Sequence, residues 1–154
     1  MRPIYTTAVL AMLAVRSVAA QAPTITWGPA PAIFPAGARM AVLEGDPGKA
    51  AMFTVRLEMP DGYKIAAHTH PTDEHLTIIK GTLLLGMGDR VDAAQATALP
   101  TGAFSSATAN MHHFAVAKGQ TIVQVNSMGP FVLTYVNPAD DPTRNSKPKA
   151  KPRQ

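Results

Sequence analysis

The 154-residue sequence contains no cysteine, so disulfides and thiolate chemistry are excluded from both the fold and the function. Aromatic residues make up only 6% of the chain, and no stretch reaches the roughly 20 consecutive apolar residues that a membrane helix needs. The fold must therefore be held together by burial alone. A chain of this length is sufficient for one domain with a substantial core and too short for two ordinary domains.

The positive charge of the chain, +4 overall, is concentrated at its two ends. Two of the fourteen basic residues lie within residues 1–20, and five follow Pro142. All ten acidic residues lie between 21 and 142, beside the other seven basic residues. The body of the protein is therefore acidic, and the sequence predicts no nucleic-acid partner.

Residues 1–20 have the pattern of a cleaved signal peptide. Arg2 precedes an apolar run, and Val18-Ala19-Ala20 has the small-residue spacing of a signal-peptidase site. An uncleaved N-terminal extension is the alternative, because Arg16 lies unusually late in the apolar region. We expect a periplasmic or secreted protein that has no membrane contact after the signal peptide is removed.

Two further segments flank the predicted domain, which spans residues 38–138. Residues 21–37 are rich in Pro, Ala and Gly and predict an extended arm that lies along a sheet or crosses to a second subunit, with a loosely packed leader as the alternative. Residues 139–154 are polar and basic and predict a disordered tail.

Between these segments the sequence predicts many short strands. Residues 53–59 alternate apolar and polar side chains with the period of a half-buried strand. Further strands are predicted at 76–79, 83–85, 114–116, 121–125 and 131–136, and most are separated by glycine. This pattern indicates an all-β protein, an antiparallel sandwich or barrel.

All five histidines lie in two short windows, at 68–75 and 112–113. Side chains two residues apart on a strand share a face, so His68 and His70 can chelate one metal ion. Glu74 follows a turn, from which its carboxylate can return toward these two imidazoles. A third imidazole from a distant strand would complete a set of three nitrogens and one oxygen.

The spacing of Gly62, His68, His70, Glu74 and Gly81 resembles the first motif of the cupin superfamily, without a gap or substitution. A degraded second motif begins at Gly102.

In this second motif Thr108 replaces a proline, Asn110 replaces a glycine and the final asparagine is absent. Asn110 tolerates the left-handed backbone that glycine would supply. Counting along the motif favours His113 as its ligand. His112 and His113 are neighbours on a predicted strand, so only one of them can reach the interior, and the choice between them stays open.

The resemblance covers residues 40–137 and implies a small antiparallel jelly-roll β-barrel with the metal inside. The implied ligands are His68, His70, Glu74 and His113. The segments at 43–47, 129–130 and 135–138 are similar to a group of exported single-domain bacterial cupins.

Such a ligand set suits Fe, Mn, Ni, Cu or Zn as a divalent ion, and affinity order does not choose among them. We expect a metal-dependent enzyme that acts on a small organic molecule by oxygenase-type chemistry, with isomerase or lyase chemistry also open. A noncatalytic metal-binding or ligand-binding protein is the alternative, and a cupin without metal is a third possibility. We also expect a homodimer, because a small jelly roll leaves open sheet edges.

The same period-two reasoning predicts which side chains accompany the ligands in the pocket. They are Ala66, Leu76, Ile78, Met111 and Ala115.

Overall fold

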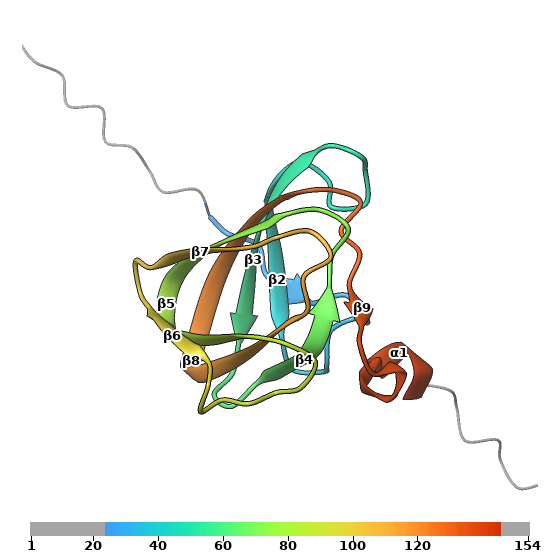
Figure 1. Ribbon diagram of the computed structural model, residues 1–154. Coiled ribbons are helices and arrows are strands. Elements are labelled where there is room, and N and C mark those ends of the chain that lie inside the picture. The colour runs from blue at the N-terminus through green and yellow to red at the C-terminus, as the bar shows by residue number, and fades with distance from the viewer. Residues whose placement is uncertain (1–23, 146–154) are drawn as a thin grey trace, which may run out of the picture.

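The computed structural model describes residues 24–145, and strands make up nearly all of its regular structure (Figure 1). The strands are β1 (Gly28–Pro29), β2 (Arg39–Glu44), β3 (Met52–Met59), β4 (Lys64–Thr69), β5 (Glu74–Met87), β6 (Thr97–Pro100), β7 (Phe104–Ala107), β8 (His113–Met128) and β9 (Thr134–Tyr135). Two short helical turns follow, η1 (Pro138–Asp140) and α1 (Pro142–Asn145). The prediction of an all-β protein is confirmed.

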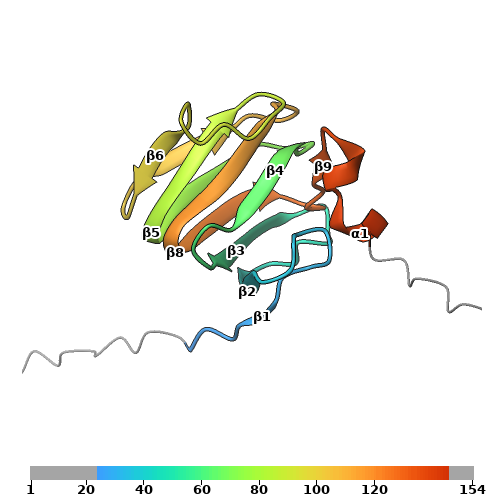
Figure 2. The ribbon, with the colours of Figure 1, turned by 90° about the horizontal axis from the view of Figure 1, so that it is seen from below.

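The nine strands form one antiparallel sheet that curls around its own interior. One path through the sheet runs β1-β2-β3-β8-β4-β9, and β5 pairs with β6, β7 and β8. Figure 2 shows the strands following one another along the curve from β6 and β5 through β8 to β3 and β2. This arrangement is the predicted jelly-roll β-barrel.

The two long strands, β5 and β8, bend together and so close the barrel. Their pairing is interrupted between Ile78 and Thr82. Gly81 lies in this interruption with φ +76°, and a Cβ at this position would clash with the backbone of Gln120. On one side of the bend β8 pairs with β3, and on the other side it pairs with β4.

Apolar side chains of the inner faces form the core. In β3 the alternation predicted from the sequence is present, since Phe53, Val55, Leu57 and Met59 are all buried. The strands predicted at 76–79 and 83–85 are parts of β5, and those at 114–116 and 121–125 are parts of β8. The strand predicted at 131–136 is wrong except at β9, because residues 129–133 form a loop that turns Phe131 and Leu133 into the barrel.

The N-terminal arm, described from residue 24, lies along the sheet. Gly28 and Pro29 pair with β2, and Phe34 is buried in the core. Two tyrosine hydroxyls hold the arm in place, because Tyr135 donates to the carbonyl of Ile33 at 2.9 Å and Tyr63 donates to that of Pro35.

Residues 138–145 contain η1 and α1, so the tail predicted from residue 139 begins with ordered turns. Side-chain caps explain them, since Asn137 and Asp141 accept hydrogen bonds from the backbone two residues later. The predicted signal peptide and residues 146–154 lie outside the described residues. No helix within 24–145 has the length and apolar character to cross a membrane.

Candidate metal centre

The structure brings the four predicted ligand residues together inside the barrel. His68 lies in β4, His70 follows it in the turn, Glu74 begins β5, and His113 begins β8 directly opposite His68. All four are buried, with exposed fractions of 3%, 3%, 6% and 2% in that order. Four ionisable side chains so deep in a protein require partners or a bound ion.

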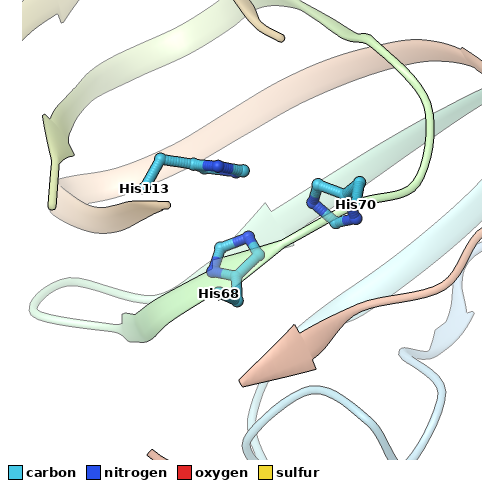
Figure 3. Close-up of side chains that lie close together, drawn as sticks. All are labelled: His68, His70 and His113. Carbon is cyan, nitrogen blue, oxygen red and sulfur yellow. The ribbon is translucent and has the colours of Figure 1, made fainter. Parts of the chain in front are cut away.

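The donor atoms of these residues lie within reach of one common ion. One ring nitrogen from each of His68, His70 and His113 lies within 4.8 Å of the others, and Figure 3 shows the three imidazoles side by side. Oε2 of Glu74 lies 3.6 Å from Nε2 of both His70 and His113. Two donors bound to one ion at about 2.1 Å lie no more than about 4.2 Å apart, so these separations come close to a coordination shell.

Backbone carbonyls fix the tautomer of each imidazole. Nδ1–H of His68 donates to the carbonyl of Ala66 at 2.7 Å, and Nδ1–H of His70 donates to that of Val132 at 2.7 Å. Nδ1–H of His113 donates to the carbonyl of Met111 at 3.0 Å. Each hydrogen bond leaves Nε2 as the free lone pair, which is the usual arrangement around a metal.

Two of these Nε2 atoms, on His70 and His113, are buried and have no hydrogen-bond partner among the described residues. Buried polar atoms without a partner are rare in native proteins and need an explanation. The three histidines form a group that could hold a metal ion, and two orphaned nitrogens fit this role.

The pKa shifts divide the site into neutral and charged members. Burial, reinforced by the neighbouring imidazoles, lowers the pKa of His68 to about 3, and burial also lowers the pKa of His70. Burial opposes charge on Glu74 and His113 as well, but their attraction outweighs it, so the pKa of Glu74 is lowered and that of His113 is raised. His68 and His70 are thus held neutral, the form that binds metals.

The four residues lie at a cavity with an empty volume of ≈ 490 Å³, including its opening to solvent. Every other side chain that lines the cavity is apolar. These are Phe34, Met40, Val55, Leu57, Met59, Ile65, Leu76, Leu83, Leu85, Ala115, Val123, Val125, Phe131 and Leu133. Among residues 24–145, therefore, the four predicted metal ligands are the polar side chains that the cavity offers to a ligand.

The structure places the two neighbouring histidines of the second window in different environments. His113 points inward, whereas His112 is exposed and lies 2.5 Å from Asp89, measured from Nδ1 to Oδ1. The turn before them has the predicted left-handed residue, Asn110 at φ 62°, whose N–H donates to the carbonyl of His70 at 2.7 Å. His75 is exposed, as its position next to Glu74 predicts.

The predicted pocket lining is confirmed at Leu76 and Ala115 and is wrong at the other three positions. A β-bulge between Ile65 and His68 moves Ile65 into the cavity in place of Ala66. Met111 is 43% exposed, because it lies in the turn before β8 and not on the strand itself.

One further residue of the predicted lining, Ile78, is buried in the core but does not line the cavity.

Sequence reasoning missed the cavity residues that lie outside the strands, notably Phe34, Phe131 and Leu133. The signal available for Phe34 was its position as a large apolar residue in a Pro-rich arm. For the 129–133 loop, the period-two pattern predicted a strand from residue 131 and did not predict that the loop enters the barrel.

A family model described as a domain of unknown function (DUF4437) matches residues 10–134. The chain belongs to this family. Its description assigns no reaction, so membership in DUF4437 leaves the chemistry to be argued from the site. A comparison with curated proteins finds no match.

Solved structures show that this DUF4437 protein has the cupin fold. It resembles a candidate acetylacetone dioxygenase from Methylibium petroleiphilum PM1, with a TM-score of 0.60, 22% identity and coverage of 82% of this chain and 88% of that chain. It also resembles the polyketide cyclase RemF from Streptomyces resistomycificus, with a TM-score of 0.57, 16% identity and coverage of 72% of this chain and 80% of that chain. For an RmlC-like cupin from Shewanella frigidimarina the TM-score is 0.51 and the identity 16%, with coverage of 60% of this chain and 76% of that chain. At these identities the likeness establishes the fold, and the predicted resemblance to the cupins is confirmed.

Proposed function

We propose that the protein is a metal-dependent enzyme that acts on a small, largely apolar organic molecule, with oxygenase-type chemistry favoured over isomerase or lyase chemistry. One observation carries this proposal. The side chains that line the cavity are apolar except for His68, His70, Glu74 and His113, and two of their nitrogens have no hydrogen-bond partner among the described residues.

The donor set suits a divalent transition metal, with Fe, Mn, Ni, Cu and Zn all compatible with three imidazoles and one carboxylate. His68, His70, His113 and Glu74 would hold it. A metal bound here would polarise a carbonyl group of the substrate or, if it is redox-active, provide for reaction with O₂.

The residues of the chain would orient the metal ligands and line the cavity in which that chemistry takes place. The Nδ1–H bonds to backbone carbonyls keep the imidazoles oriented, and apolar side chains line the rest of the cavity. Beyond these four residues, no side chain that lines the cavity within the described part of the chain can titrate. The lining that the structure describes also contains no lysine or arginine side chain, which favours a substrate without a carboxylate or phosphate remote from the metal.

The comparisons give modest support to an enzyme of this kind. Two structures of the same fold bear the names of enzymes, a candidate acetylacetone dioxygenase and a polyketide cyclase. Their identities to this chain are 22% and 16%, so the names suggest substrates to test and do not assign one.

The test is anaerobic reconstitution with Fe(II), followed by measurement of O₂ uptake with a panel of β-diketones, catechols and flavonoids. Mn(II), Ni(II), Cu(II) and Zn(II) are loaded in parallel, with product analysis for reactions that consume no O₂. We expect substrate-dependent turnover with at least one metal, equal in the His112→Ala variant and absent in His113→Ala. Metal binding without turnover on any panel member would contradict the proposal and favour the noncatalytic alternative.

Export and the homodimer remain predictions. The cleaved N-terminus of the protein in a periplasmic extract tests the first, and light scattering of the purified protein tests the second.

A further inference from the structure

His70 differs from the other two imidazoles in how it is held. His68 and His113 donate Nδ1–H to carbonyls only two residues away, those of Ala66 and Met111. His70 lies beyond the end of β4, and its Nδ1–H reaches the carbonyl of Val132, 62 residues along the chain. The orientation of this imidazole therefore depends on a distant loop.

The neighbour of Val132 in that loop contacts the same imidazole. The ring of Phe131 stacks on His70, with 4.9 Å between the ring centroids and 14° between the planes. Phe131 also lines the cavity. One edge of the imidazole is thus hydrogen-bonded to residue 132 while one of its faces is covered by residue 131.

The loop that carries both contacts is itself anchored. The N–H of Phe131 donates to the carbonyl of Pro47 at 2.7 Å, and the N–H of Gly129 donates to that of Ala51 at 2.9 Å. A Cβ at Gly129 would clash with the carbonyl oxygens of Lys49 and Pro47, so the two loops are in close contact.

Two other aromatic rings pack against the ring of Phe131. Phe34 of the N-terminal arm lies 6.2 Å from it, centroid to centroid, and Phe53 lies 5.3 Å away in an edge-to-face arrangement. Aromatic pairs at these distances stabilise each other beyond their burial. These two contacts hold in place the Phe131 ring that stacks on His70.

We infer that Phe131 is a positioning residue for His70: it holds the imidazole in the plane from which Nε2 faces the cavity. The expected effect on metal binding rests on the proposed function, whereas the effect on the orientation of the His70 ring does not. Replacing the aromatic ring should disturb one ligand and leave His68 and His113 in place.

The variants separate the stacked ring from mere bulk. Phe131→Leu keeps apolar volume and removes the ring, whereas Phe131→Tyr keeps the ring. Phe104→Leu is the matched control, because the ring of Phe104 stacks on the exposed imidazole of His75 and is not among the residues that line the cavity.

Titration with Co(II) alone measures both affinity and, through visible absorption, the coordination geometry. We expect Phe131→Leu to lower the affinity about 10-fold to 100-fold and to change the absorption bands, as removal of support behind a ligand typically does. Phe131→Tyr and the control should stay within about 3-fold of the parent protein with unchanged bands. Equal affinity and identical bands in Phe131→Leu would overturn the inference.

Nuclear magnetic resonance of the metal-free protein gives a reading that needs no metal. The parent protein should show His70 as the Nδ1–H tautomer, with ring-proton shifts displaced by the Phe131 ring. Phe131→Leu should remove that displacement for His70 alone, and Phe131→Tyr should retain it. If the parent binds no Co(II), the proposed function fails while these shifts still decide the inference; unchanged His70 shifts in Phe131→Leu would refute it.

Discussion

His112 and His113 are adjacent in the sequence, yet they lie in opposite environments. His113 is 2% exposed and faces Glu74, whereas His112 lies at the surface beside Asp89. The same division separates His70 from His75 in the first window. This division sorts five similar side chains into a buried set of three and a surface pair.

The hydrogen bonds of the two faces differ in a more informative way. On the outer face, polar side chains satisfy one another, as Arg56 does with Gln124 and Asn126 does with Thr54. In the cavity, the imidazoles of His70 and His113 are hydrogen-bonded at Nδ1, but their Nε2 atoms have no hydrogen-bond partner among residues 24–145. An unsatisfied atom in a well-satisfied protein marks a place where another group is expected.

Replacing His113 with alanine should have the largest effect on metal affinity, and the same replacement at His112 is its control. His113→Ala removes a donor and should lower metal affinity at least about 100-fold, above the range for residues that only support a ligand. His112→Ala removes only a surface contact and should change affinity less than about 3-fold. Competition with a chromogenic chelator measures both variants, and the reverse ranking would show that the ligand assignment is wrong.

Metal addition should stabilise the protein in proportion to its binding. At a free metal concentration about 100 times Kd, the free energy of unfolding should rise by about 2.7 kcal/mol, because the unfolded chain does not assemble the site. Thermal unfolding with and without a chelator measures this change. The change should persist in His75→Ala and disappear in His113→Ala, and a similar gain in both variants would place the metal elsewhere.

Acid should destabilise the metal-free protein through the buried histidines. His68 has a pKa of about 3 in the folded state, against about 6.5 in an unfolded chain. Between these values the unfolded state binds a proton that the folded state does not, so the free energy of unfolding falls as pH falls from about 6.5 toward 3.

Urea unfolding at several pH values measures this slope, and His68→Leu should reduce it. His75→Leu is the surface control and should leave it unchanged. A parent protein whose stability is flat across this range would contradict the burial of a neutral His68.

The smallest effect is expected at the surface pair. His75 stacks on Phe104, itself 63% exposed, and its Nδ1 lies 3.0 Å from Oγ of Ser106. His75→Ala should change the free energy of unfolding by less than about 1 kcal/mol and leave metal binding intact, as is usual for exposed contacts. Loss of metal binding in this variant would contradict the division of the histidines into buried ligands and a surface pair.

Much of the fold could be predicted from the sequence because its signals are local. Period-two alternation placed β3, glycines placed the turns, and a complete motif placed His68, His70 and Glu74. His113 followed from a register count that survived the change of glycine to Asn110, since asparagine tolerates the left-handed backbone found there.

The remainder depended on tertiary contacts that no local pattern encodes. A β-bulge in β4 brought Ile65 into the cavity in place of Ala66. Phe131 joined the site because its loop packs on residues 47–51, more than 75 positions earlier in the sequence. Such errors arise wherever a bulge or a distant loop overrides the strand period.

The central claim is that the buried histidines and Glu74 bind a metal ion. The most direct test is elemental mass spectrometry of the purified protein after reconstitution with each candidate metal and removal of excess ion. The account predicts about one ion per chain for at least one metal, retained in His112→Ala and lost in His113→Ala. Less than about a tenth of an equivalent with every metal would contradict it.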